Sequence, residues 1–263
     1  MRIPLPKSRE AHVWSCPLDM LSYEGVWNAL GEILSMAERE KLQRRRAGRI
    51  QLEYLAARVV VRTVLSAYTD VPSADLVFQQ DSLGRPSLAS PNDANLDFNV
   101  SHTDGVIMVG VAANGWIGID VEDVSRDVGL DSLLPDFLTN DERNWVESAR
   151  PTERAQRILR LWTLKEAWCK AVGLGMSAEF HKAAFRFQGE HLRSAQVTDA
   201  TAGELTWIFH QIPVAERFLL AVALGVQSEP PLLSESCNKG SLILRNWAAH
   251  PSLACSGAAV WNH

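Results

Sequence analysis

Hydrophobic and polar positions follow two different periods in the first part of the chain. Residues 12–16 form a short apolar run typical of a strand, and a helical region then extends to about residue 68 with a break near Gly48. Residues 52–63 within it carry apolar side chains at helical spacing. The pattern then changes to short apolar runs separated by polar turns, which predict strands of one antiparallel sheet. These runs cover residues 76–78, 96–100 and 106–111, and a further strand over 116–121 follows a turn at Asn114 and Gly115.

The second part of the chain repeats this order. Thr139 and Glu142 have the spacing of a capping box at a helix start, and a long helix is predicted over residues 152–172, ended by Gly173. Strands of a second sheet follow at residues 185–187, 206–211 and 218–224. The repeated order predicts an α+β fold with two similar halves, residues 1–113 and 114–226. Residues 227–263 are rich in Ser, Pro and Asn, and we interpret them as a loosely attached tail.

Composition and charge narrow the class of protein. The chain has 263 residues, of which 46% are hydrophobic and 22% charged, as in globular proteins, and its net charge of -5 argues against a dedicated nucleic-acid binder. The start of the chain holds no apolar signal segment, and the uncharged apolar stretch of residues 106–119 is too short to span a membrane. Four scattered cysteines without a CxxC motif fit reduced thiols. We therefore expect a cytoplasmic protein that binds neither nucleic acid nor membrane.

The net charge hides a polarity along the chain. Eight basic residues lie between residues 38 and 62, whereas residues 120–147 contain nine acidic residues and two arginines. Either run can be a solvated helix face. Asp120 and Glu122, however, are two residues apart on a predicted strand, so their carboxylates point to the same side. Two adjacent carboxylates repel each other, and oxygen ligands of this kind suit Mg²⁺, so a magnesium site is the alternative to a solvated strand end.

A lysine interrupts the apolar stripe of the long second helix. Lys165 lies among apolar positions, where a charge needs a partner, and a bound phosphate is one explanation. Glu166 and Lys170 lie four residues apart on the same helix, where a surface ion pair is the simpler interpretation.

Four short motifs, preceded by a basic helix, resemble those of the Sfp-type 4′-phosphopantetheinyl transferases over about residues 12–226. They are Gly84-Arg85-Pro86, Phe98-Asn-Val-Ser101-His102, Gly118-Ile-Asp120-Val-Glu122 and Trp162-x-x-Lys165-Glu166-Ala-x-x-Lys170. The resemblance implies a pseudo-dimer of two α+β halves with the active site in the cleft between them. It also implies transfer of the 4′-phosphopantetheine arm of coenzyme A to a serine of an apo carrier protein, with Mg²⁺ as cofactor and adenosine 3′,5′-bisphosphate as product.

The resemblance also implies roles for individual residues. Asp120, Glu122 and Glu166 would bind the metal, and Lys165 and Lys170 would hold the pyrophosphate. Arg85, Ser101 and His102 would hold the nucleotide end, and the candidates on the basic helix are Lys41, Arg44 and Arg49. The catalytic base is left open between Glu166, a metal-bound water and Glu142, whose position as a helix cap is an equally good explanation.

Two other functions remain open at this stage. A non-catalytic carrier-protein binder of the same fold would need to lack one of the chemical residues, and none of them is missing. Another Mg²⁺-dependent phosphoryl or nucleotidyl transferase would leave Lys165 and Lys170 without a role, and the sequence has no P-loop or kinase-type glycine loop. We expect a monomer that acts on fatty-acid, polyketide or peptide-synthetase carriers.

Overall fold

The computed structural model describes residues 3–90, 95–125, 137–174, 180–198, 205–227 and 240–247. Its first part contains helices and strands in an order that begins with a strand and ends with two antiparallel strands. They are β1 (Glu10–Pro17), α1 (Tyr23–Leu30), α2 (Met36–Gln43), α3 (Arg49–Tyr68), β2 (Val77–Gln80), β3 (Pro86–Ser90), β4 (Leu96–Thr103) and β5 (Val106–Ala113), with short 3-10 helices at Gly31–Ile33 and Ser73–Asp75.

The second part has the same kinds of elements in the same order. They are β6 (Gly115–Asp123), α5 (Asn140–Glu147), α6 (Pro151–Val172), β7 (Ala183–Gln188), β8 (His191–Val197), β9 (Leu205–Val214) and β10 (Phe218–Gln227), with a 3-10 helix at Phe180–Lys182 before β7. Each part thus runs from one strand through a long helix and a β-hairpin to two paired strands. A last strand, β11 (Ser241–Asn246), follows.

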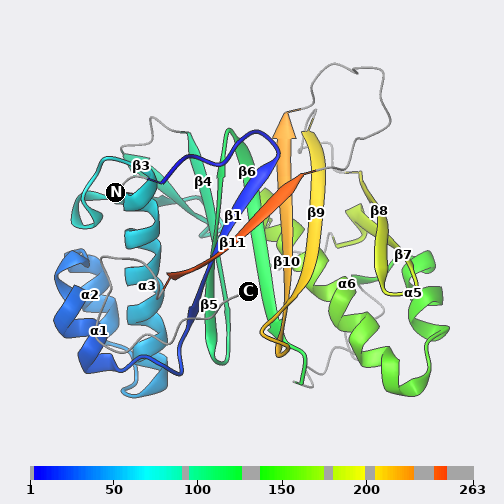
Figure 1. Ribbon diagram of the computed structural model, residues 1–263, viewed down its shortest axis with the longest axis horizontal. Helices are drawn as coiled ribbons and strands as arrows, with labels where there is room; N and C mark the ends of the chain where they lie inside the picture. Colours follow the sequence, from blue (N-terminus) through cyan, green and yellow to red (C-terminus); the bar gives the residue numbers. More distant parts are fainter. Residues whose placement is uncertain are drawn as a thin grey trace.

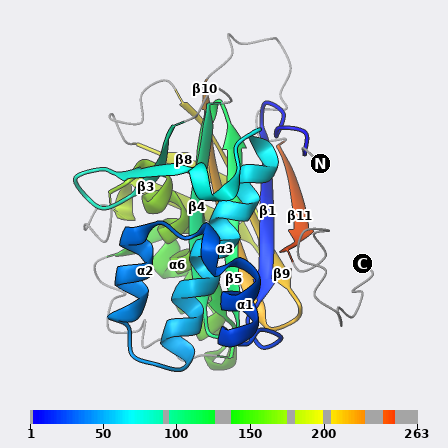
Figure 2. The same ribbon diagram turned by 90° about the vertical axis from the view of Figure 1, so that its left-hand side faces the viewer.

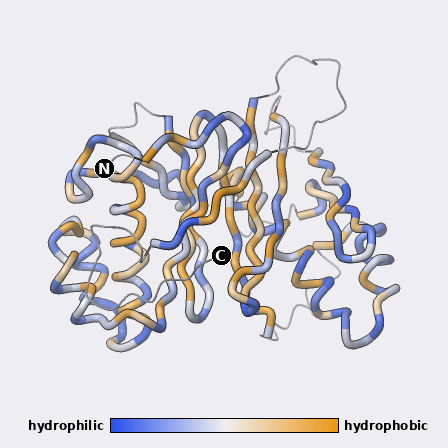
Figure 3. The backbone as a smooth tube through the Cα atoms, viewed as in Figure 1, coloured by the Kyte–Doolittle hydropathy of each residue, from blue (hydrophilic) through white to orange (hydrophobic). Residues whose placement is uncertain are grey.

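Two main sheets lie between two groups of helices (Figure 1). Their strand orders are β11-β1-β5-β4 and β6-β10-β9. One core cluster joins α3 to the first sheet, a second joins α6 to the second sheet, and a third lies between β1 and β5 on one side and β6 and β10 on the other. The central strands are hydrophobic along their length (Figure 3), because both of their faces are covered. Figure 2 shows α1, α2 and α3 on the outer side of the first sheet.

The predicted α+β class is confirmed, but the division into sheets was incompletely predicted. The strand predicted at residues 76–78 does not join the first sheet, because β2 pairs with β3 in a separate hairpin. The strand predicted at residues 185–187 likewise pairs with β8 instead of the second sheet. We did not predict β8, since its sequence is mostly polar and exposed. No helix in the described parts of the chain is long and apolar enough to cross a membrane.

The predicted helix boundaries are confirmed at three positions. Gly48 separates α2 from α3 with a φ of +94°, a left-handed conformation that costs glycine little. Thr139 and Glu142 form both hydrogen bonds of a capping box at the start of α5. Gly173 ends α6 in the left-handed conformation.

The interpretation of residues 227–263 as a loosely attached tail is wrong for residues 240–247. Strand β11 pairs in parallel with β1 over six residue pairs, and Leu242 packs against the core between the sheets. Trp247 is buried, and its Nε1 donates a hydrogen bond to Oγ1 of Thr63 in α3 at 2.8 Å. The apolar residues 242–244 therefore add a strand to an edge of the first sheet, which the predominantly polar composition of the segment concealed.

Candidate active site

Close packing of α6 against β6 builds the site. A side chain at Gly118 would place its Cβ 2.0 Å from the carbonyl oxygen of Ala167, so only glycine allows the helix to lie this close to the strand. Two residues beyond Gly118, Asp120 lies opposite the last turns of α6, which carry Glu166 and Lys170. The packing thus brings the predicted acidic strand and the predicted lysine helix together.

Asp120, Lys170 and Ser101 form one polar cluster, in which Asp120 and Ser101 are buried and Lys170 is partly exposed. Oδ1 of Asp120 lies 2.6 Å from Nζ of Lys170 and accepts a hydrogen bond from Oγ of Ser101 at 3.1 Å. Nζ of Lys170 is also 3.1 Å from that hydroxyl. Asp120 and Ser101 are 4% exposed, so their polar atoms have little access to water. The cluster joins three elements, β4, β6 and α6, which are far apart in sequence.

Glu166 is the most perturbed carboxyl group of the site. Its pKa is raised to about 7, chiefly by burial; the charge of Lys170 opposes the rise, and the charges of Asp120 and Glu122 add to it. The residue is 7% exposed. A carboxyl group with a pKa near neutrality can bind or release a proton under ordinary conditions.

Two carboxylate oxygens of the site are buried and lack a hydrogen-bond partner among the described residues. They are Oδ2 of Asp120 and Oε1 of Glu166. Buried oxygens of this kind are costly unless a donor or a cation meets them, and carboxylate oxygens suit Mg²⁺. In the parts of the chain that the structure describes, no group of three or more His, Cys, Asp or Glu side chains is arranged so that it could hold a metal ion, so the fit rests on these two oxygens. Lys170 supplies the positive charge beside Asp120 in this arrangement, and the two oxygens fit a divalent cation that would compete with this ammonium for Asp120.

The structure contradicts the predicted phosphate-binding role of Lys165. Its ammonium donates to the carbonyl oxygens of Phe180 (2.9 Å) and Ala183 (2.6 Å) and pairs with Oε2 of Glu142 at 3.0 Å. These contacts use all three of its donors, and the residue is 0% exposed. Burial lowers the pKa of Lys165, and the charge of Glu142 opposes that shift. Lys165 therefore holds α6, α5 and the start of β7 together.

Glu142 is correspondingly a structural residue and not the catalytic base. Its Oε1 accepts a hydrogen bond from the backbone N–H of Phe185 at 2.9 Å, and its Oε2 accepts one from that of Thr139 at 2.8 Å. With the ion pair to Lys165, both oxygens are occupied, and the side chain is inaccessible to substrate. Of the two explanations open from the sequence, the structure supports the helix cap.

Arg85 connects the β2–β3 hairpin to the site instead of pointing freely toward a ligand. Its guanidinium pairs with Asp97 at 2.7 Å and donates to the carbonyl oxygens of Lys170 (2.9 Å) and Ile117 (3.1 Å). Its charge is thus balanced within the protein, and these contacts do not support the prediction that it holds a nucleotide phosphate.

The three basic candidates before residue 50 differ in their surroundings. Lys41 and Arg44 are exposed, and the ion pair of Arg44 with Glu40 is long, at 4.0 Å. Arg49 instead pairs with Asp104 at 2.5 Å and with Glu53 at 3.2 Å. Its guanidinium is already paired with carboxylates in an ion-pair network, so the structure does not support the prediction that it binds an anion.

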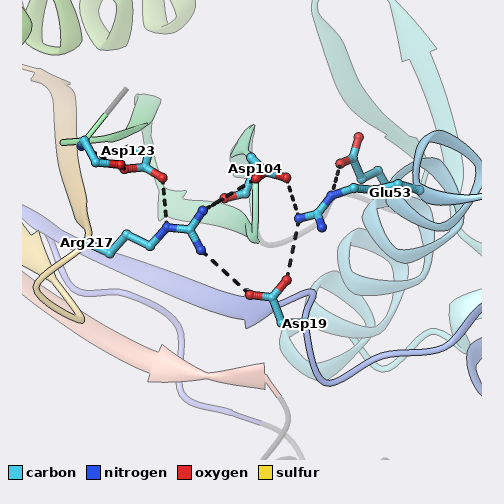
Figure 4. A network of polar contacts seen from close by, with 7 residues as sticks. Asp19, Glu53, Asp104, Asp123 and Arg217 are labelled. Carbon is cyan, nitrogen blue, oxygen red and sulfur yellow. Dashed lines mark hydrogen bonds and ion pairs between the residues drawn. The ribbon is translucent and has the colours of Figure 1, made fainter. Parts of the chain in front are cut away.

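The same network reaches the second half of the chain through Arg217. Figure 4 shows Arg217 directed toward Asp19, Asp104 and Asp123. Asp123 ends β6 and Arg217 precedes β10, whereas Asp19 and Asp104 belong to the first half of the chain. Ion pairs thus connect the two halves of the chain at this point. Two of the residues involved, Asp123 and Asp104, lie close in sequence to Glu122 and His102.

His102 and Ser101 lie on opposite sides of β4. Neighbouring residues of a strand point to opposite faces, so His102 shares the face of Phe98 and Val100, which pack against the core around α3. His102 is exposed, whereas Ser101 points toward Asp120. A single ligand that met both residues would have to cross the end of this strand.

Two residues beside the site had no role in the sequence analysis, although Asn99 lies within one of the four motifs. Asp97 accepts a hydrogen bond from the backbone N–H of Ile117 at 2.8 Å, and Asn99 accepts one from that of Ile119 at 3.1 Å. The polar residues at 97, 99 and 101 alternate with apolar ones, which was a visible signal for a polar face along β4. What that face contacts was not visible in the sequence.

The fold and site define a mixed α+β protein in which buried carboxyl groups meet a partly exposed lysine between two sheets. Two family models match its sequence: that of the 4′-phosphopantetheinyl transferase superfamily covers residues 117–223, and that of the N-terminal part of 4′-phosphopantetheinyl transferases covers residues 22–114. The 4′-phosphopantetheinyl transferase HetI of Nostoc sp. is 32% identical over 172 residues, or 65% of this chain and 71% of HetI. The chain belongs to the 4′-phosphopantetheinyl transferase superfamily, and it is an enzyme of that transferase type.

Two further proteins are similar to this chain over part of its length. The human L-aminoadipate-semialdehyde dehydrogenase-phosphopantetheinyl transferase is 26% identical over 65% of this chain and 60% of its own length. The crystal structure of a holo-(acyl-carrier-protein) synthase from Bacillus anthracis in complex with CoA (3′,5′-ADP) covers 43% of this chain and 96% of that chain, with 24% identity and a TM-score of 0.35.

Proposed function

We propose that this protein transfers the 4′-phosphopantetheine arm of coenzyme A to a serine of an apo carrier protein, in an Mg²⁺-dependent reaction that releases adenosine 3′,5′-bisphosphate. The observation that carries the proposal is the pair of buried, unpartnered oxygens on Asp120 and Glu166 beside the ammonium of Lys170. A cation site next to a lysine is the combination that a pyrophosphate requires, because both charges can neutralise its oxygens.

The residues of the cluster divide the chemistry between them. Asp120, Glu122 and Glu166 would hold Mg²⁺, which would supply positive charge to the phosphate oxygens. Lys170 would turn from Asp120 toward the pyrophosphate when the metal binds. Ser101 and His102 are proposed to meet the nucleotide end of coenzyme A, and the exposed side chains of Lys41 and Arg44 are the remaining candidates for its phosphates.

The transfer step breaks one bond and forms one. The carrier serine Oγ attacks the phosphorus next to the pantetheine, and the bond from that phosphorus to the bridging oxygen of the pyrophosphate breaks. Adenosine 3′,5′-bisphosphate leaves with the bonding electrons. Glu166 is proposed to accept the serine proton, as a carboxylate of the site that is ionised when the metal is bound.

We further propose that residues 1–113 and 114–226 form a pseudo-dimer with the site between them. The same order of elements in both parts, and the matching strand orders β1-β5-β4 and β6-β10-β9, support this. Because β4 of one part and β6 and α6 of the other supply the site, a single chain contains the proposed active residues, which supports a monomer.

The direct test measures the mass of the product. The purified protein is incubated with coenzyme A, Mg²⁺ and apo carriers of the fatty-acid, polyketide and peptide-synthetase types, and each carrier is weighed by intact-mass spectrometry. We expect at least one carrier to gain the mass of one phosphopantetheine, and Asp120→Ala to abolish the gain. No gain on any carrier, or an equal gain with Asp120→Ala, would contradict the proposal. Calorimetric titration with coenzyme A and with ATP distinguishes it from a nucleotidyl transferase.

A further inference from the structure

Strands β4 and β6 run beside each other without pairing through their backbones. The two main sheets have the orders β11-β1-β5-β4 and β6-β10-β9, and no backbone ladder between β4 and β6 exists in the described residues. Side chains replace that ladder. Backbone N–H groups of β6 donate to side-chain oxygens of β4, and we name these three bonds the seam: Ile117 to Asp97 (2.8 Å), Ile119 to Asn99 (3.1 Å) and Val121 to Ser101 (3.2 Å).

The seam has a strict period of two on both strands. Each β4 residue that accepts a bond lies two positions from the next, and so does each β6 residue that donates one, so the bonds fix a single register between the sheets. Ile117 and Ile119 are 0% exposed and Val121 is 1% exposed. A buried N–H that loses its acceptor pays the cost of an unmade hydrogen bond, so each β4 side chain is required at its position.

The seam leads directly into the proposed active site. Asp120 lies between Ile119 and Val121, the donors to Asn99 and Ser101, so the seam holds the backbone on both sides of this carboxylate. Ser101 already belongs to the site through its contacts with Asp120 and Lys170. Asn99 is not itself part of the site, because the hydrogen bond that it accepts comes from Ile119, the residue before Asp120.

From this arrangement we propose that Asn99 is a positioning residue, which acts through the backbone of Ile119 to hold the Asp120 carboxylate where it meets a metal ion. The proposal rests on the proposed function of Asp120. Without the acceptor at Asn99, β6 is free to shift relative to β4, and Asp120 moves with it. Residues that orient a metal ligand in this indirect way commonly change metal affinity by about 10- to 100-fold when they are replaced.

The test compares two replacements at this position. Asn99→Leu has a similar volume but no acceptor, whereas Asn99→Asp keeps an oxygen for the Ile119 N–H. Mg²⁺ binding is measured by calorimetry in the absence of coenzyme A, and amide hydrogen exchange is measured for residues 117–121. We expect Asn99→Leu to weaken Mg²⁺ binding by about tenfold and to speed exchange at Ile119, and Asn99→Asp to preserve slow exchange there.

Val100→Ala is the matched control, since Val100 is a neighbour on β4 that packs toward the core around α3. It should lower stability without changing Mg²⁺ affinity. If Asn99→Leu does not fold, Asn99→Ala replaces it, because alanine also lacks an acceptor for the Ile119 N–H and adds no bulk.

The outcomes separate the two proposals. If the wild-type protein binds Mg²⁺ and the Asn99→Leu variant binds it equally well, the positioning role alone is overturned. A wild-type protein with no Mg²⁺ affinity would overturn the metal site of the proposed function, and this inference with it.

Discussion

Nζ of Lys165 lies 3.0 Å from Oε2 of Glu142, and both side chains are completely buried. The pair connects the start of α5 to the middle of α6, and Lys165 also bonds Phe180 and Ala183 at the entry to β7. A motif lysine next to the glutamate proposed as the catalytic base is thus part of the core. The adjacent residues Lys165 and Glu166 have different roles because successive helix positions point about 100° apart.

Breaking this pair should destabilise the protein strongly. Lys165→Met leaves the Glu142 carboxylate buried without its counter-charge, and such changes typically cost about 3–5 kcal/mol. The double variant Lys165→Met with Glu142→Gln should recover part of the loss, because no uncompensated charge remains. Urea unfolding of the three proteins measures both effects. A single variant as stable as the wild type would show that the pair does not hold these elements together.

The raised pKa of Glu166 predicts how stability changes with pH in the absence of metal. The folded state holds the proton more tightly than the unfolded state, in which the pKa has its ordinary value of 4.5. The stabilising contribution of the neutral group is therefore complete below about pH 4.5 and is lost as the pH rises toward about 7. Glu166→Gln should remove this loss. Unfolding free energies of both proteins in EDTA, from about pH 4 to pH 8, provide the comparison; parallel curves would contradict the assignment.

Lys170 and a metal ion should compete for Asp120. Without Mg²⁺, Lys170→Met removes the closest partner of a buried carboxylate and should cost about 1–3 kcal/mol of stability. Mg²⁺ should restore that stability, and it should bind the variant more tightly than the wild type when coenzyme A is absent, since no ammonium competes with it. Thermal unfolding with and without Mg²⁺ measures this, and the exposed Arg193→Met serves as the control. A loss that Mg²⁺ does not reverse would argue against a metal at Asp120.

Strand β11 should contribute to the stability of the first sheet. A chain that ends after Gln227 loses the six residue pairs of β11 with β1 and the buried Trp247. We expect a clearly lower melting temperature, because burial of one tryptophan side chain alone is commonly worth about 3–5 kcal/mol. A chain that ends after Trp247 is the matched control and should melt near the full-length protein. Equal melting temperatures for the two shortened chains would show that β11 is dispensable.

Much of the candidate site could be predicted from local sequence. Asp120 and Glu122 share a strand face, and Glu166 and Lys170 share a helix face, because these relationships depend only on the period of each element. The break at Gly48, the cap at Thr139 and the end of α6 at Gly173 were predicted for the same reason, since backbone conformation at these positions follows from one or a few neighbouring residues.

The sequence by itself therefore determined the α+β class, the main strands and helices, and the residue types that can perform the chemistry. Only the tertiary structure decided which charges remain available. It placed Lys165 and Arg49 against carboxylates from other elements, left oxygens of Asp120 and Glu166 without a hydrogen-bond partner among the described residues, and aligned β4 with β6 through side chains. The physical reason is that the partner of a charged group is set by burial and by distances of a few ångströms between elements far apart in the chain, and no local pattern encodes those distances.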